Sequence, residues 1–287
     1  MNAKILFKIA NSFLLYDLST KSQFNAVIRK KLKQEDRIIT VGDNVEFVKD
    51  QYEYVIEKID ERKNLLIRPK VANIDTLIIV NSVKEPDFSS YGLNKFLAFY
   101  EARNINNVII YFSKMDLLNK QESKNMNQII SQYEQNGYIV LNSLDKEKNK
   151  EKILNMIKNN VVCFAGQSGV GKSTLINFLI PDLELRTQEI SQALNRGKHT
   201  TTSSLMIPFN EGFVIDTPGF GSLDLNMTQL ELANSFTDFR NNSVHCKFKN
   251  CLHTNEQNCF IKKMVDENKI YKQRYLDYLK MFSEIKK

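Results

Sequence analysis

The sequence predicts an α/β protein whose parallel sheet follows a small β-barrel and precedes a metal-binding helical segment. Three observations predict this class. Residues 1–70 hold short aromatic and β-branched runs separated by turn residues, residues 71–223 alternate apolar strands with helices, and residues 224–287 hold three cysteines close to a histidine. These ranges are the three domains that we expect.

The N-terminal 70 residues are expected to form five short strands. Gly42-Asp43 marks a tight turn before one of them. The expected strands are Ile5–Ile9, Phe13–Tyr16, Phe24–Ile28, Asn44–Val48 and Tyr54–Ile59. This number of strands in so short a stretch favours an OB-fold, which binds single-stranded nucleic acid through a basic groove with exposed aromatics. The candidate groove residues are Lys21, Arg29, Lys30, Lys31, Lys33 and Arg37. The alternative is a structural β-domain with an ordinary basic surface.

The central region has the pattern of parallel strands that helices cover on both faces. Thr76–Val80 and Val108–Phe112 are continuous apolar runs, and Leu93–Ala102 between them has helical spacing. Two further expected strands, Val161–Ala165 and Phe213–Ile215, each end at a motif that handles phosphate. The sequence therefore predicts a nucleotide site at the carboxyl ends of these strands.

The first of these motifs is a complete phosphate loop between a strand and a helix that includes 173–179. Lys172 is expected to reach the β- and γ-phosphates, and the Ser173 hydroxyl is expected to bind Mg²⁺. The second motif is Asp216-Thr-Pro-Gly219, in which Asp216 can hold the metal through water and the Gly219 N–H can contact the γ-phosphate. The expected phosphate-loop contacts are Gly166, Gln167, Ser168, Gly169, Val170, Gly171, Lys172, Ser173 and Thr174.

The base-reading motif comes before the phosphate loop, although in Ras-like GTPases it comes last. It consists of Ser113, Lys114, Met115 and Asp116, directly after an expected strand. The Asp116 carboxylate can accept from the guanine N1–H and 2-amino group, whereas adenine offers no such pair of donors. This favours a GTPase over a generic P-loop ATPase. The order predicts a circularly permuted Ras-like domain, which a fold tolerates when its original termini lie close together.

Two positions of the base-reading elements differ from the usual pattern. Ser113 stands where asparagine is usual, and its shorter hydroxyl predicts weaker guanine binding. The last element, usually Ser-Ala, is assigned weakly to Asn142-Ser143-Leu144.

Phe220 stands where Ras-like enzymes place the glutamine that orients water, and a phenyl ring cannot do this. His199 lies between the two phosphate motifs, where the switch segment belongs, and is therefore the candidate catalytic residue. One of Thr200, Thr201 and Thr202 is expected to close on Mg²⁺, and we assign Thr201. The alternative is a basic loop that holds a histidine by chance.

Cys246-x4-Cys251-x-His253-x5-Cys259 supplies four zinc ligands within fourteen residues. Three thiolates and one imidazole complete a tetrahedral Zn²⁺ site with no open position, so the metal is expected to be structural. His245 is an alternative ligand, and Cys163 is expected to be a buried apolar residue. After the cluster, 265–285 is expected to be helical, with Arg274 among the basic residues near the exposed side. The face expected to dock on the body consists of Ile270, Tyr271, Tyr275, Leu279 and Phe282.

Charge and composition indicate a soluble cytoplasmic protein with a polyanionic partner. The net charge is +7; residues 1–70 hold 14 Lys and Arg against 10 Asp and Glu, and residues 224–287 hold 11 against 8, so the excess lies on the two flanks. No apolar run reaches the roughly 18 residues of a membrane span, and the N-terminus lacks a signal-peptide pattern.

These motifs, in this order, resemble the RsgA family of bacterial ribosome-assembly GTPases over essentially the whole chain. The resemblance implies a Mg²⁺-dependent GTP hydrolase that carries one Zn²⁺, binds the 30S subunit and its rRNA late in maturation, and is stimulated by that subunit. It also implies His199 as the catalytic residue. We expect a monomer that binds GTP and GDP and no membrane. The rival functions are a permuted GTPase of the large subunit and an RNA- or metal-binding module with a decayed GTPase.

Overall fold

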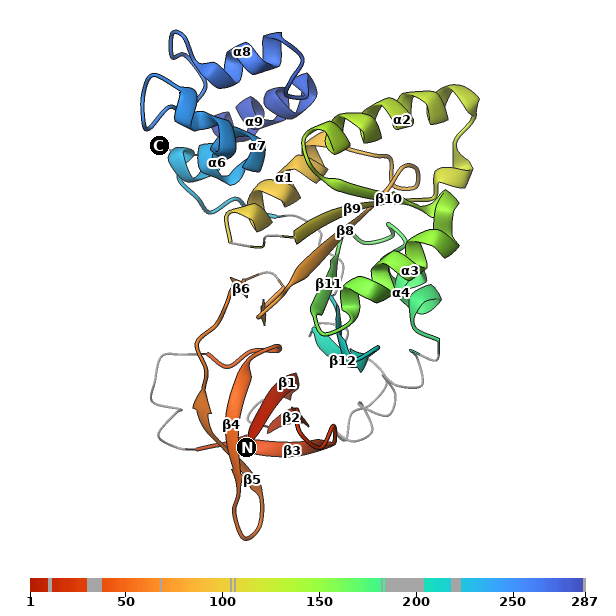
Figure 1. Cartoon of the computed structure of the whole chain (residues 1–287), viewed down its shortest axis with the longest axis vertical. Helices are drawn as coiled ribbons and strands as arrows, with labels where there is room; N and C mark the ends of the chain where they lie inside the picture. Colours follow the sequence, from red (N-terminus) through yellow and green to blue (C-terminus); the bar gives the residue numbers. More distant parts are fainter. Residues whose placement is uncertain are drawn as a thin grey trace. The chain divides into compact units, whose positions relative to one another are not determined.

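The structure is a computed structural model of the whole chain (Figure 1). It describes residues 1–9, 12–29, 38–67, 69–103, 105, 107–181, 183, 204–217 and 223–285. The chain divides into two compact units, which we describe separately. Unit 1 comprises Met1–Thr76, Lys150–Ala165 and Lys172–Pro218, and unit 2 comprises Leu77–Asn149, Gly166–Gly171 and Gly219–Lys287.

The N-terminal part of unit 1 is a closed five-stranded barrel. Its strands are β1 (Asn2–Ile9), β2 (Ser12–Asp17), β3 (Gln23–Ile28), β4 (Asn44–Lys49) and β5 (Tyr54–Ile59). They follow the order β1-β2-β3-β5-β4, and β4 pairs back onto β1. β3 and β5 are parallel, whereas the other neighbours are antiparallel. All five expected strands are therefore confirmed, and the order is that of an OB-fold.

The barrel closes because alternate side chains of each strand point to one interior. Ile5, Leu15, Phe47 and Ile56 are almost fully buried there. The expected turn before β4 is also present. Gly42 has φ +90, and a Cβ at this position would lie 2.2 Å from the Ala72 carbonyl oxygen, so only glycine fits. The adjacent Asp43 is fully buried and accepts hydrogen bonds at 2.6 Å from Arg62 Nε and at 2.8 Å from the Thr40 N–H.

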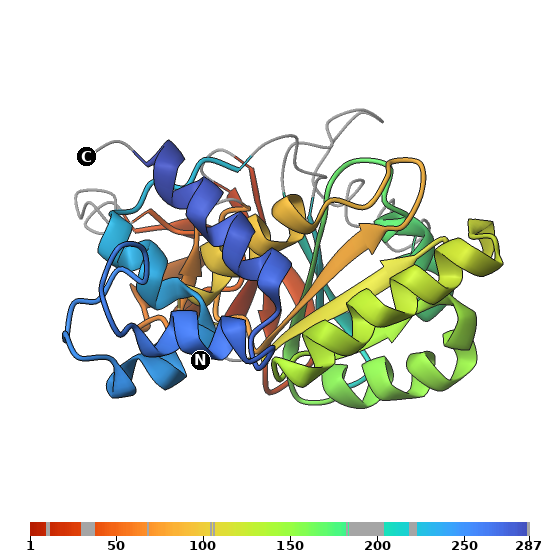
Figure 2. The same cartoon turned by 90° about the horizontal axis from the view of Figure 1, so that it is seen from above.

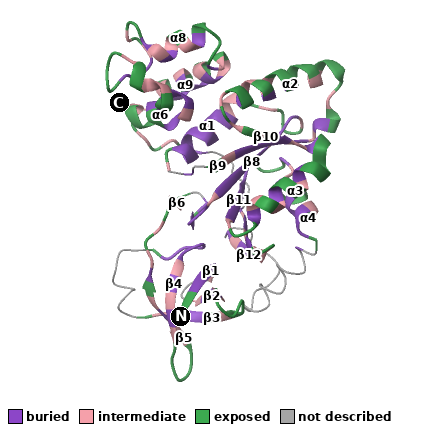
Figure 3. Cartoon of the chain, viewed as in Figure 1, coloured by how far each residue is buried: buried purple, intermediate pink, exposed green. Residues whose placement is uncertain are grey.

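The rest of unit 1 supplies half of the α/β part. A short pair, β6 (Leu65–Leu66) and β7 (Val71–Ala72), follows the barrel. β11 (Val161–Ala165) then pairs in parallel with β13 (Gly212–Asp216), and β12 (Leu205–Phe209) is antiparallel to β13. The helices are most of α3 (Lys146–Ile157) and all of α4 (Lys172–Leu179). All five residues of β11 are buried, as the apolar run predicts (Figure 3).

Unit 2 holds the other strands, in the order β10-β9-β8. They are β8 (Thr76–Ser82), β9 (Asn107–Ser113) and β10 (Ile139–Asn142), and β9 is parallel to β10. Helix α1 (Ser90–Glu101) links β8 to β9, and α2 (Lys120–Gln135) links β9 to β10. Asn119 and Glu122 form a capping box that begins α2. Two 3₁₀ turns, η2 (Met115–Leu117) and η3 (Ser143–Asp145), follow β9 and β10.

The C-terminal part of unit 2 is helical. It consists of α6 (Gln229–Ser235), α7 (Thr237–Asn242), the 3₁₀ turn η4 (Ser243–His245), α8 (Phe260–Asp266) and α9 (Lys272–Glu284). Helix α9 lies beside α1 (Figure 2). No helix in the described part of the chain combines the length and the apolar character that crossing a membrane requires.

Two expectations about the C-terminal helix were wrong. The single helix over 265–285 is two helices, because Asn268 adopts a left-handed φ of +56 and ends the first. Arg274, which we expected near the exposed side, is fully buried. The buried face of α9 consists of Arg274, Asp277, Tyr278 and Met281, whereas Tyr275, Leu279 and Phe282 are only partly buried. Periodicity located the apolar side chains. It could not show that Arg274 would be buried beside the carboxylates of Asp238 and Glu101.

Candidate nucleotide site and metal centre

The phosphate loop follows β11 directly, and its first glycine meets neighbouring backbone. A Cβ on Gly166 would lie 2.5 Å from the Val80 carbonyl oxygen, which explains the glycine there. Gly169 and Gly171 have φ values of +80 and +86, a conformation that only glycine adopts without strain. Gln167, Ser168 and Gly169 are exposed, whereas Val170 is buried. The loop therefore has the backbone conformation that phosphate binding requires, and residues 167–169 are exposed to a ligand.

Helix α4 begins at Lys172, the one basic residue of the phosphate motif. The Lys172 ammonium group is nearly buried and forms an ion pair with Asp216, the final residue of β13. Ser173 and Thr174, in the first turn of α4, are exposed. The Thr217 hydroxyl donates to the Phe164 carbonyl oxygen at 2.7 Å, which fixes the chain directly after Asp216.

On β11, burial raises the pKa of the Cys163 thiol well above its usual range, so this cysteine is a small apolar residue as expected.

The base-reading motif lies on the turn after β9. Ser113 and Met115 are buried, whereas Asp116 is exposed and available to a ligand. Lys114 has φ +59, and its ammonium group donates to the Glu85 carbonyl oxygen. These residues form a sharp turn that presents Asp116 beyond the strand end.

The weakly assigned 142–144 segment lies next to this turn. The Ser143 hydroxyl oxygen accepts from the Met115 N–H at 3.0 Å, and the Asn142 side chain accepts from the Leu144 N–H at the same distance. Ser143 therefore braces the base-reading turn directly, which is a role that spacing alone did not establish.

Several expected site residues fall outside the described part of the chain. These are His199, Thr200, Thr201, Thr202, Gly219 and Phe220, together with Lys30, Lys31, Lys33 and Arg37 of the expected groove. Among the described groove candidates, Lys21 and Arg29 are exposed, and Arg29 forms an ion pair with Glu57 at 2.6 Å.

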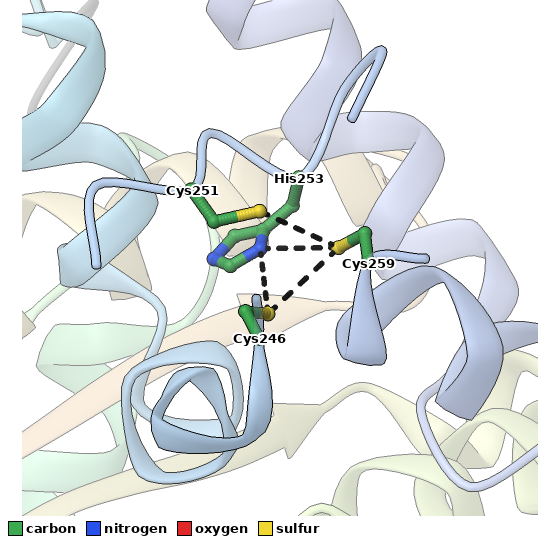
Figure 4. Close-up of side chains that lie close together, drawn as sticks. All are labelled: Cys246, Cys251, His253 and Cys259. Carbon is green, nitrogen blue, oxygen red and sulfur yellow. Dashed lines mark hydrogen bonds between the residues drawn. The ribbon is translucent and has the colours of Figure 1, made fainter. Parts of the chain in front are cut away.

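The four predicted zinc ligands are brought together, as Figure 4 shows. Their ligand atoms all lie within 4.8 Å of one another, and Cys251, His253 and Cys259 are buried. In a tetrahedral site, Zn–S bonds of 2.3 Å put two sulfurs about 3.8 Å apart. The Cys251–Cys259 and Cys246–Cys259 sulfur separations are 3.7 and 4.0 Å, and His253 Nδ1 lies 3.8 Å from the Cys246 sulfur. The donor set therefore fits one zinc ion by spacing and by chemistry.

The surroundings of the cluster also fit a cation. Burial raises the pKa of Cys251 to about 12 and lowers the pKa of His253, so a bound cation would be needed to hold the thiolates. The Tyr275 hydroxyl donates to the His253 carbonyl oxygen at 2.7 Å, which ties the ligand loop to α9. His245, the alternative ligand, lies instead against the ring of Phe260 and is exposed.

A buried charged network, which sequence reasoning missed, joins the helices of unit 2. Arg274 bonds to both Asp238 carboxylate oxygens, to Asn94 Oδ1 at 2.9 Å and to the Tyr138 hydroxyl at 2.6 Å. Glu101 lies 3.8 Å from the guanidinium group. Burial alone would lower the pKa of Arg274. The neighbouring Asp238, Tyr138 and Glu101 raise it by more than burial lowers it, so the pKa is above its usual value and the guanidinium stays charged. No local signal could reveal this network, because its members are up to 180 residues apart.

Comparisons with known proteins agree along the whole chain. A family profile described as "RsgA GTPase" matches residues 59–226. The "Small ribosomal subunit biogenesis GTPase RsgA" of Ureaplasma urealyticum serovar 10 is 47% identical over 99% of this chain and 95% of its own length. The protein of the same name from Clostridium botulinum strain Langeland is 44% identical over 89% of this chain and 87% of its own length.

Two solved structures have the same fold over nearly the full chain. One is described as "YloQ, a circularly permuted GTPase", with a TM-score of 0.82, 29% identity, and coverage of 99% of this chain and 94% of the other. The second is YjeQ from Thermotoga maritima, with a TM-score of 0.84, 30% identity, and coverage of 99% and 97%. The predicted circular permutation is thereby confirmed.

Proposed function

Because this chain belongs to the RsgA family of circularly permuted GTPases and is therefore a GTP hydrolase, we propose that it acts on the small ribosomal subunit. The observation that supports this partner most is the similarity over almost the full chain to relatives named for small-subunit biogenesis. We propose that hydrolysis is stimulated by the subunit, late in its maturation, and that the protein works as a monomer in the cytoplasm.

We assign the nucleotide contacts to the two phosphate motifs and the base-reading turn. The backbone of Gly166–Thr174 would hold the phosphates, Lys172 would neutralise their charge, and Asp116 would read the guanine. Ser173, Asp216 and Thr201 would hold Mg²⁺, which when bound neutralises phosphate charge. The Gly219 N–H would contact the γ-phosphate. The exposure of Ser173, Thr174 and Asp116 supports these assignments.

We divide the proposed work among three regions. Residues 1–70, which contain the OB barrel, and residues 224–287, which contain the zinc cluster, would bind rRNA through their basic excess. Residues 71–223 would bind and hydrolyse GTP. The zinc ion would be structural, because four protein ligands leave it no open position.

His199 is the proposed catalytic residue, because Phe220 cannot orient water. The imidazole would hydrogen-bond the attacking water once the subunit holds the loop in place. A group supplied in this way accelerates related GTPases by up to roughly 10³–10⁵-fold. We therefore expect slow turnover by the protein alone and much faster turnover with small subunits.

The test is phosphate release by the unmodified protein and by His199→Ala, each measured alone, with small subunits and with large subunits. We expect His199→Ala to keep nearly normal GTP and subunit binding but to lose most of the stimulation. Lys172→Ala is the control, since it should lose nucleotide binding itself. If His199→Ala were still fully stimulated, the catalytic group would have to be a residue other than His199. Stimulation by large subunits alone would support a GTPase of the large subunit. Stimulation by neither subunit would support an RNA- or metal-binding module with a decayed GTPase.

A further inference from the structure

The Ser113 hydroxyl points to the phosphate loop. Ser113 ends β9 with 6% of its surface exposed, and its Oγ donates to the Val170 carbonyl oxygen at 2.5 Å. A second carbonyl oxygen, that of Asn81, lies farther away at 3.3 Å. The hydrogen bond to Val170 joins residues that are 57 positions apart in the chain. It therefore ties the strand that carries the base-reading turn to the loop that carries the phosphates.

A serine hydroxyl has one proton, so it donates one strong hydrogen bond at a time. The hydroxyl donates that proton to the Val170 carbonyl oxygen, which lies 2.5 Å away, nearer than the Asn81 carbonyl oxygen. Guanine N7 is an acceptor, so a protein that reads it must donate a hydrogen bond to it. Ser113 cannot supply one without releasing Val170.

The phosphate loop depends on this contact because the strand end packs directly against it. A Cβ on Gly171 would lie 3.6 Å from both Cβ and Oγ of Ser113. Val170 is 3% exposed, so its carbonyl oxygen would lose a partner in buried surroundings if the hydroxyl were removed.

The usual asparagine has two amide protons and could donate both to the loop and to N7, whereas a serine hydroxyl has only one proton.

We propose that Ser113 is a positioning residue that holds the phosphate loop through Val170 and leaves guanine N7 unread, so that Asp116 carries base recognition. This inference rests on the proposed GTP site. It also gives the departure from asparagine a specific consequence, because the single hydroxyl proton holds the loop and is not available to N7.

The experiment compares binding of GTP and 7-deaza-GTP, which lacks the N7 acceptor, by titration calorimetry. In the unmodified protein we expect the two dissociation constants to agree within about twofold, since no hydrogen bond to N7 is lost. Ser113→Ala should weaken both nucleotides equally, by about tenfold. Ser113→Thr should restore most of the affinity, and Ser131→Ala, on the outer side of α2, should change nothing.

Two results would overturn the proposal. A protein that prefers GTP over 7-deaza-GTP, and loses that preference in Ser113→Ala, reads N7 through Ser113. Unchanged affinity in Ser113→Ala would mean that the hydroxyl does not hold the loop. Amide exchange of 166–171 without added nucleotide gives a second measure, since Ser113→Ala should exchange faster. If ATP competed with GTP as well as GTP does with itself, the proposed GTP site would be refuted. The amide exchange rates of 166–171 would still test whether Ser113 holds the loop.

Discussion

Lys172 and Asp216 illustrate how single residues of this site serve two partners. The ammonium group is nearly buried, and an unpaired buried charge costs several kcal/mol, so the ion pair with Asp216 stabilises it. In the proposed complex, Lys172 would pair with the phosphates and Asp216 would help to hold the metal. Each charged group would therefore keep a partner of opposite charge when nucleotide binds.

Asp116 gives the prediction that belongs to the residue scale. Asp116→Asn removes a charged acceptor for two guanine donors and should weaken GTP binding by about 2–4 kcal/mol. It should also improve the relative binding of xanthosine triphosphate, whose base offers the complementary group. Calorimetry with both nucleotides measures this, and Asp50→Asn, on the exposed β4–β5 turn of the barrel, is the matched control. Unchanged selectivity in Asp116→Asn would assign base reading to another residue.

The element that depends most on one interaction is the loop between η4 and α8. This stretch, residues 246–259, has no helix or strand of its own, and it contains all four ligands of the cluster. The core beside it includes the buried Phe239, Ile261, Val265 and Tyr278. A metal would join the four ligands of this loop to one another beside the core and so supply folding energy for the loop.

Zinc content is the prediction at this scale. Protein purified without chelator should carry about one Zn²⁺ per chain, measurable by elemental analysis. Cys251→Ser should lose the metal and the structure of the C-terminal region, seen as protease sensitivity after residue 223, while GTP binding largely survives. Cys163→Ser tests a thiol outside the cluster and should keep the zinc. Stoichiometric zinc in Cys251→Ser would show that other residues bind it.

Within unit 2, the molecule is held together by charge as well as by apolar packing. Arg274 on α9 contacts Asn94 on α1, Tyr138 beside β10 and Asp238 on α7. Glu101 accepts from the Tyr138 hydroxyl and, at 2.8 Å, from the N–H of Thr237. The C-terminal helices are thus attached to the helices and strands that carry the base-reading turn through buried, oriented hydrogen bonds.

Removing Arg274 is the prediction for the molecule as a whole. Arg274→Leu leaves Asp238 and Glu101 buried without their cation and should lower stability by about 3–5 kcal/mol. Lys272→Leu, exposed on the same helix, should change stability little. Urea unfolding followed by near-ultraviolet circular dichroism measures both variants. Equal stability of the two would mean that the network contributes no net free energy.

The sequence by itself determined what depends on neighbours along the chain. The apolar runs of the five barrel strands and of β8, β9 and β11 predicted those strands, the Gly166–Ser173 motif predicted a loop followed by a helix, and the spacing from Cys246 to Cys259 predicted a cluster. These predictions succeeded because backbone conformation, strand burial and a short ligand loop are set by local residues.

Only the tertiary structure decided the partners of polar side chains. The sequence placed Arg274 near solvent, and it could not anticipate that Ser113 would donate to the Val170 carbonyl oxygen or that Ser143 would accept from the Met115 N–H. Each of these contacts joins residues at least 28 positions apart, and a polar side chain in a sequence window carries no record of the distant group that will bond to it. Burial of an arginine or a hydroxyl becomes favourable only when the fold supplies that partner, so the fold, and not the local pattern, chose which side chains hold the site.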